Sequence, residues 1–275
     1  MIIDCHAHAC GDFLLPETII GKLDMAGADK VILVPGQLNS ARKYPLPDLA
    51  KIFPKQNVLK IANRLLTKLT LNIPGVIDQI PEGNEYVYNL CRKTNGRALQ
   101  FVWITQRMKN VIDYLNEKYK LWNFKGLKIH QCWRKLPIKS DFFLQAAGWA
   151  EEHELPLFIH LYSDKDVRDL IEYKRTHPKQ KIIVGHLFGI EVFIKYNFKD
   201  ENLFFDISPY QFTSIYRLSK AINFFGASHV VLGSDSPYGK NSLEKNIEKI
   251  LRLDISDNEK ELILGENMRA MLKPD

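Results

Sequence analysis

The chain has 275 residues, of which 45% are hydrophobic and 25% are charged, and its formal net charge is +6 at pH 7. These proportions are ordinary for a globular protein with a sizeable core. No apolar run approaches the roughly 18 residues of a membrane-spanning helix, which excludes that class of protein. The lysines are scattered along the chain, so we interpret the positive charge as solvated surface that would also suit an anionic ligand.

The four cysteines, Cys5, Cys10, Cys91 and Cys132, lack the CxxC spacing of metal and redox motifs. So few cysteines in a chain of this length predict free thiols in a cytoplasmic protein. The first apolar segment starts at Met1, so we expect no signal peptide, which agrees with that location.

The first predicted element is a strand at the amino terminus, where the sequence reads MIIDCHAH. Side chains two residues apart on a strand point the same way, so His6 and His8 present two imidazoles on one face. Imidazole is the commonest protein ligand for borderline metals such as zinc. The opening of the chain therefore predicts half of a metal site.

Short apolar runs alternate with amphipathic segments along the rest of the chain. Strands are predicted over 2–5, 30–34, 98–104, 126–130, 155–160, 181–185, 202–207 and 229–233, and helices over 111–121, 141–152, 166–174 and 215–225. This alternation is typical of parallel βαβ units, and eight of them predict an α/β protein with a closed (β/α)8 TIM barrel. No strand precedes a G-x-G-x-x-G or P-loop pattern, which disfavours a nucleotide-binding sheet.

The second unit is irregular, because more than sixty residues separate the predicted strands over 30–34 and 98–104. A usual crossover connection is far shorter. We interpret 36–97, with a helical run over 57–71, as an insertion within a single domain that spans 1–275. It would form a lid over the open end of the barrel or a contact in a homodimer, and extra packing on the barrel's side is the alternative.

Polar side chains that could bind a metal stand where predicted strands end. His130 closes GLKIH, His160 closes LPLFIH, His186 follows IIVG, and Asp235 follows VVLGS. The active site of a parallel barrel lies at the carboxyl ends of its strands. Five histidines and one aspartate therefore share one rim. The other histidines, His153, His177 and His229, are placed elsewhere and receive no chemical role.

The ordered set of motifs resembles the amidohydrolase superfamily, and more specifically its amidohydrolase-related branch, which includes aminocarboxymuconate-semialdehyde decarboxylase. The matching segments are IIDCHAHA, GLKIHQ, LPLFIH, IIVGHLFG, VVLGSDSPYG and ILGENMRAML. They occur in the expected order over nearly the whole chain, and the segment from 35 to 97 matches least. The resemblance implies a metal-dependent enzyme with one divalent metal ion, Zn²⁺ ahead of Mn²⁺ or Fe²⁺.

The resemblance also implies a role for each rim residue. The metal ligands would be His6, His8, His160 and Asp235, and His186 would be the general acid/base beside them. Three imidazoles and a carboxylate hold one divalent cation and leave a position open for water. Asp235 could bind the metal or accept a proton from water, so it is both a ligand and a catalytic candidate.

The predicted strand over 126–130 does not decide whether the site holds one metal ion or two. Two-metal members of the superfamily use a carboxylated lysine there, and Lys128 is the candidate in this chain. Lys128 lies about 6–7 Å deeper along the strand than His130, so we expect one metal, with Lys128 beneath the rim and His130 beside the ligands or the substrate. Further candidates to line the substrate pocket are Trp133, Arg134, Tyr162, Tyr210 and Tyr238, with Arg134 suited to a substrate carboxylate.

Two reactions fit this ligand set. The function that we predict is hydrolysis of an amide, lactone or related carbonyl by metal-activated water. The alternative is metal-dependent non-oxidative decarboxylation of an aromatic or enoic acid. A TatD-like deoxyribonuclease also has a His-x-His barrel, but it is expected to carry a glutamate where this chain reads GLKIHQ. We therefore expect a small-molecule substrate, with no nucleic acid and no membrane as partner.

Overall fold

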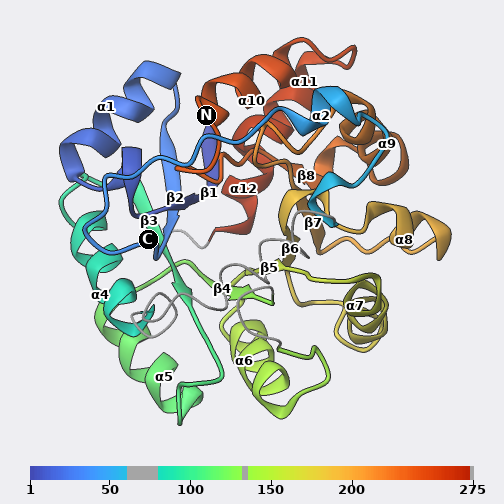
Figure 1. The fold of residues 1–275 in the computed structure, drawn as a ribbon. Coiled ribbons are helices and arrows are strands. Elements are labelled where there is room, and N and C mark those ends of the chain that lie inside the picture. The colour runs from blue at the N-terminus through green and yellow to red at the C-terminus, as the bar shows by residue number, and fades with distance from the viewer. Residues whose placement is uncertain (61–79, 132–135, 273–275) are drawn as a thin grey trace.

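The computed structural model describes residues 1–60, 80–131 and 136–272. Eight parallel strands lie side by side in chain order around a barrel (Figure 1). They are β1 (Ile3–His8), β2 (Lys30–Val34), β3 (Ala98–Trp103), β4 (Gly126–His130), β5 (Leu157–His160), β6 (Ile182–Val184), β7 (Leu203–Asp206) and β8 (Val230–Val231). The last strand region returns to the first, because Cys5 N–H donates to Leu232 O at 2.8 Å and Asp235 N–H donates to His6 O at 2.7 Å. The predicted (β/α)8 barrel is confirmed.

Helices surround the barrel on its outer side (Figure 1). The described α-helices are α1 (Pro16–Ala26), α2 (Leu49–Ile52), α4 (Ile80–Cys91), α5 (Val111–Trp122), α6 (Asp141–Glu152), α7 (Asp164–Thr176), α8 (Ile190–Lys195), α9 (Ile215–Phe225), α10 (Ser242–Leu251), α11 (Asp257–Glu261) and α12 (Asn267–Met271). Serine side chains begin several of them, for example Ser140 before α6 and Ser163 before α7, where each Oγ accepts a backbone N–H of the first turn. Within the described residues, no helix has the length and apolar character needed to cross a lipid bilayer.

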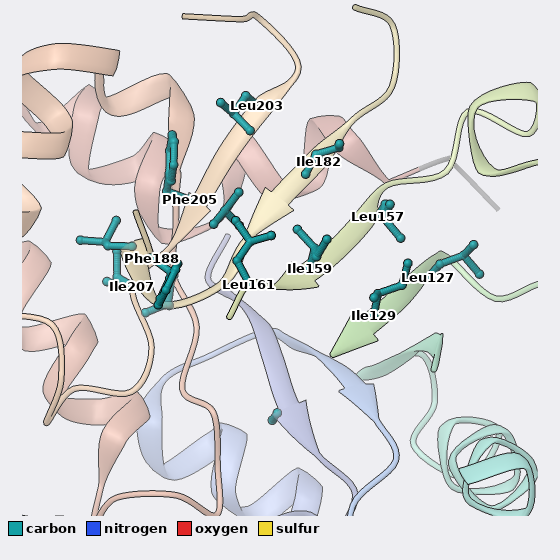
Figure 2. Close-up of a cluster of buried hydrophobic side chains, with 14 of the residues drawn as sticks. Leu127, Ile129, Leu157, Ile159, Leu161, Ile182, Phe188, Leu203, Phe205 and Ile207 are labelled. Carbon is teal, nitrogen blue, oxygen red and sulfur yellow. The ribbon is translucent and has the colours of Figure 1, made fainter. Parts of the chain in front are cut away.

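Alternate residues of each strand face the helices and the barrel interior. On β4, Leu127 and Ile129 pack outward with Leu157 and Ile159 of β5 in the layer beneath the helices (Figure 2). The intervening Lys128 and the terminal His130 therefore face inward, as the period of a strand requires. A second apolar cluster fills the lower barrel and includes Phe101, Phe158 and Ile183, with Met268 and Met271 of α12 closing it. This packed floor leaves the carboxyl ends of the strands as the open end.

The stretch from 36 to 97 contains both an ordinary barrel helix and a segment that crosses the rim. Its last part is α4, which packs against β3 and β2 as a crossover helix does. Its first part reaches the loops after β7 and β8, because Ala50 N–H donates to Gln211 O at 2.8 Å and Gly239 N–H donates to Tyr44 O at 2.8 Å. Most of the predicted helix over 57–71 lies outside the described residues, and whether 36–97 is a lid or a dimer contact stays a prediction.

Candidate metal centre

The two histidines of the His-x-His motif lie inside the barrel at the end of β1. They share a strand face with Asp4, which is fully buried one step below them. Asp4 Oδ1 accepts the backbone N–H groups of His6 at 3.2 Å and Ser234 at 2.8 Å. Burial raises the pKa of the Asp4 carboxyl to about 7. Asp4 thus ties the strand that carries the histidines to the loop that carries Asp235.

Two hydrogen-bond acceptors, His8 Nε2 and Asp235 Oδ1, face each other at the rim, and His6 Nδ1 lies beside them. His8 Nδ1 lies 2.8 Å from Pro35 O, and because a carbonyl only accepts, Nδ1 carries the proton and Nε2 holds the lone pair. That Nε2 is 3.3 Å from Asp235 Oδ1. His6 Nδ1 is buried, lies 3.6 Å from the same oxygen, and has no hydrogen-bond partner among the described residues. The lone pairs of His8 Nε2 and Asp235 Oδ1 repel unless a cation lies between them, and with His6 these residues form a group of metal-binding size.

A second pair of imidazoles lies beside this cluster. His186 Nδ1 is 2.7 Å from Ser208 O, so it is the donor and Nε2 is the acceptor nitrogen of the neutral ring. His160 Nδ1 lies 3.1 Å from His186 Nε2 and therefore supplies the hydrogen. The lone pair of His160 then remains on Nε2, the atom that could ligate a metal. Burial, and next the nearby His130, lowers the pKa of His160 well below its usual range, which favours the neutral ligand form.

Asp206, the last residue of β7, belongs to this centre although the sequence analysis did not select it. Its Oδ2 accepts from the backbone N–H of His186 at 3.1 Å and from Ser208 Oγ at 2.6 Å. The same oxygen is 3.9 Å from His6 Nδ1, and His6, His186 and Asp206 form a second group that could hold a metal. Its position at a strand end is the signal that selected the other rim residues, so the same rule could have found it.

The surroundings of Asp206 explain how a carboxylate fits inside the barrel. A Cβ at position 233 would collide with Asp206 Oδ1, so only glycine fits there. Burial raises the pKa of Asp206, whereas its hydrogen bonds from Ser208 oppose that rise. His186 itself has a left-handed backbone with φ +64°, and the bond from its N–H to Asp206 holds this conformation.

Lys128 lies beneath the rim, as predicted from its place on β4. Its Nζ is 3.0 Å from His6 Nε2 and 3.9 Å from the centre of the Phe158 ring. An ammonium at Lys128 donates to His6 Nε2, which leaves the imidazole proton on Nδ1. His6 can therefore offer a lone pair to the rim only if Lys128 gives up a proton or the ring turns over.

His130 borders the centre and does not enter either metal-sized group. Its ring stacks on Trp103 with 5.5 Å between centroids and lies 4.1 Å from the His160 ring. Burial, and next the charge of Lys128, lowers its pKa well below the usual range. His130 and Trp103, the last residue of β3, form a flat aromatic wall beside His8, whose ring centroid is 5.9 Å from that of Trp103.

The remaining predicted residues are dispersed. Tyr238 lies near His8, with ring centroids 5.5 Å apart, and stacks on Tyr44 of the crossing segment. The Tyr162 N–H donates to Gln131 Oε1 at 3.3 Å near the end of β5. Tyr210 lines a separate cavity between α2, α9 and α10. The predicted residues Trp133 and Arg134 lie outside the described residues.

Residues 73–273 match the family model described as amidohydrolase. This chain belongs to the amidohydrolase family. The resemblance drawn from the motifs, to the amidohydrolase-related branch of the superfamily, is confirmed. Enzymes of this family generally use a divalent metal, which the facing acceptors of the centre fit. No curated protein matches the chain.

Several solved structures share the fold at low sequence identity. They include 2,6-dihydroxybenzoate decarboxylase from Rhizobium, with 15% identity, 98% of each chain covered and a TM-score of 0.67. 4-Oxalomesaconate hydratase from Rhodopseudomonas palustris has 13% identity, covers 98% of this chain and 95% of its own, and has a TM-score of 0.67. A probable 2-pyrone-4,6-dicarboxylic acid hydrolase from Acinetobacter baumannii has 13% identity, 98% coverage of each chain and a TM-score of 0.66. Proteins with this fold therefore include a decarboxylase, a hydratase and a probable hydrolase.

Proposed function

We propose that this amidohydrolase-family enzyme hydrolyses an amide, lactone or related carbonyl of a small organic substrate with a metal-activated water. The observation that carries the proposal is the fixed tautomer of His186. Because His186 Nδ1–H donates to Ser208 O at 2.7 Å, the neutral ring has only Nε2 with which to accept a proton. An acceptor nitrogen at the rim is what removal of a proton from water requires.

The ligands in this proposal are His6, His8, His160 and Asp235, with Zn²⁺ as the expected ion. A bound divalent metal polarises a carbonyl and lowers the pKa of water from about 15.7 toward about 7. His8 and His160 offer Nε2 lone pairs, since Pro35 O and His186 Nε2 fix the protons on their other nitrogens. Asp235 supplies the negative charge, and its Oδ1 already faces both imidazoles of β1.

His186 is the proton carrier in this mechanism, and Asp206 is its support. His186 Nε2, which accepts a hydrogen bond from His160 Nδ1–H, would take a proton from the attacking water once that hydrogen bond is broken, and would later return it to the leaving group. Asp206 holds the backbone of His186 and the hydroxyl of Ser208, so the ring keeps its orientation during the transfer.

Non-oxidative decarboxylation of an aromatic or enoic acid is the second candidate. The stacked rings of His130 and Trp103 favour it, because the partly exposed ring of His130, backed by the buried Trp103, can stack on a planar substrate next to the ligands. In that reaction the protonated His186 would deliver a proton to the carbon that loses CO₂.

The test is a substrate panel of lactones, amides and aromatic carboxylic acids, assayed in ¹⁸O-labelled water. Hydrolysis places ¹⁸O in the product acid and releases no CO₂, whereas decarboxylation releases CO₂ without adding labelled oxygen to the product. Protein purified without chelators or a histidine tag should contain about one metal ion per chain, in keeping with a four-ligand site. Turnover that survives complete metal removal would contradict both reactions.

A further inference from the structure

A cavity of about 300 Å³ lies outside the metal centre, between α2, the start of α9, and α10. None of the metal-centre residues lines it. One wall comes from the crossing segment around α2, and this wall is attached to the barrel where Ser214 Oγ donates to Pro54 O at 2.5 Å. The walls of the cavity are therefore held together by a hydrogen bond at the rim. The proposed hydrolysis does not use this cavity.

The charge of the cavity walls is mainly positive. The lining includes four basic residues, Lys51, Lys245, Lys249 and Arg252, against the two acidic residues Asp48 and Glu248. Arg252 already pairs with Glu248 on α10. An anion would therefore meet an excess of positive charge here.

Lys249 is the most deeply buried of the four basic residues that line the cavity. Its side chain is only 6% exposed, and Nζ donates to Thr213 O at 2.6 Å and Asn246 Oδ1 at 3.0 Å. Within the part of the chain that the structure describes, no carboxylate lies within ion-pair distance of this ammonium. Burial lowers its pKa to about 7. A buried cation held by neutral oxygens gains most from an anion beside it.

The same wall holds three further hydrogen-bond donors, one hydroxyl and two backbone N–H groups. Thr213 is fully buried and lines the cavity, and its Oγ1 has no hydrogen-bond partner among the described residues. The next residue, Ser214, caps α9 by accepting the N–H of Arg217. The N–H groups of Ile215 and Tyr216 in the first turn have no acceptor within the helix, and they lie at its positive end.

The outer part of the cavity is apolar. Ile215 and Tyr216 line it and remain 54% and 48% exposed, which is high for such large side chains. Pro54 adds to this part, whereas the ring of Tyr210 lies beside the cations, with its centre 4.3 Å from Lys249 Nζ and 5.2 Å from Lys245 Nζ. A ligand that suits both regions has an oxyanion at one end and an aromatic or other apolar body at the other.

We propose that this cavity is a second binding site, separate from the metal centre, for a small organic oxyanion. The phosphate or carboxylate accepts from Thr213 Oγ1 and the first turn of α9 beside Lys249, and the apolar body lies against Ile215 and Tyr216. Phosphate and carboxylate share this chemistry, so the experiment compares them directly.

The test is calorimetric titration of the metal-loaded enzyme with phenyl phosphate, inorganic phosphate and benzoate. We expect saturable binding of phenyl phosphate, and at least tenfold weaker binding in Thr213→Val, which keeps the shape of the side chain and removes the hydroxyl. Lys249→Met should have a similar effect. The matched control is Lys165→Gln, which removes one positive charge from an exposed position on α7 and should bind as the wild type does.

Hydrogen–deuterium exchange locates the bound probe. Phenyl phosphate should protect the peptides that contain residues 48–54 and 213–217. Because Thr213→Val leaves the metal ligands intact, binding at the metal alone would give equal affinity in the wild type and this variant, and that result would overturn the proposal. Absence of saturable binding of all three probes to the wild type would overturn it as well. Stronger binding of benzoate than of phenyl phosphate would identify a carboxylate as the preferred group.

Discussion

Backbone carbonyl oxygens set the protonation of individual side chains at the metal centre. Pro35 O fixes the tautomer of His8, and Ser208 O fixes that of His186. A carbonyl oxygen cannot change role with pH, so these two imidazoles keep their acceptor nitrogens toward the rim whenever the rings are neutral. The fold thus presents both lone pairs in the absence of a metal, as the proposed ligand role of His8 and the proposed base role of His186 require.

Removal of one facing acceptor should abolish metal binding. Asp235→Ala takes away the carboxylate that both imidazoles of β1 face, so we expect metal affinity to fall by more than ~100-fold. His6→Ala should behave in the same way. The measurement is metal content per chain by plasma mass spectrometry. His153→Ala, at the end of α6, is the control and should retain the metal.

Asp206 should act on His186 and not on the metal. In Asp206→Asn one oxygen becomes an amide N–H₂, which places a donor against the donors that surround the native carboxylate. We expect the metal to be retained, turnover to fall ~10–100-fold, and the free energy of unfolding to drop by about 1–3 kcal/mol. Metal content, turnover on the substrate that the panel identifies, and urea denaturation check this. Loss of the metal from Asp206→Asn would instead identify Asp206 as a metal ligand.

At the scale of elements, apolar runs predicted where strands lie, and hydrogen bonding decided where they end. The strands over 30–34 and 126–130 were predicted with their observed bounds. The strand predicted over 155–160 begins only at Leu157, because Pro156 has no N–H to donate to a neighbour. The His-x-His motif could be recognised because it opens the chain. Asp206 was missed because a single carboxylate at the end of a predicted strand is weak evidence for a catalytic or metal-binding role.

The close packing of Asp206, at the end of β7, against the chain just after β8 depends on Gly233, which has no side chain. Gly233→Ala would place a Cβ on Asp206 Oδ1, so we expect a loss of about 1–3 kcal/mol in the free energy of unfolding and a fall in turnover. Gly148→Ala on α6 is the matched control. A Cβ there meets nothing within 4 Å, and alanine should stabilise the helix by up to about 1 kcal/mol. Equal effects of the two changes in urea denaturation would contradict this account.

The two ends of the barrel differ in chemical character, because one is closed by apolar packing and the other carries the polar groups. Met268 and Met271 of α12 pack into the lower barrel and close it. Polar groups collect at the other end, where the crossing segment around α2 meets the loops after β7 and β8. The sequence predicted the rim from the order of its strands, but the cavity beside α2 depends on contacts between Pro54 and Ser214, residues too far apart in the chain for any local pattern to connect them.

The buried lysine of that cavity should make global stability depend on pH. Lys249 has a pKa of about 7 in the fold against an ordinary value of 10.5, so between these values the unfolded chain binds more protons than the folded one. Its unfavourable contribution is constant below pH 7 and diminishes as pH rises toward 10.5. Between pH 7 and pH 9 the wild type should therefore gain about 2–3 kcal/mol in the free energy of unfolding relative to Lys249→Met.

Urea denaturation of the wild type and Lys249→Met at pH 7 and pH 9 measures this difference. The other charges that face the site are Asp48 and Lys51 on the α2 side and Lys245, Glu248 and Arg252 on α10. All five remain in both proteins, so their titration cancels in the comparison. A pH-independent difference would mean that Lys249 stays charged throughout, held by the oxygens of Thr213 and Asn246. Saturating phenyl phosphate should reduce the difference, because an anion beside the ammonium stabilises its charged form.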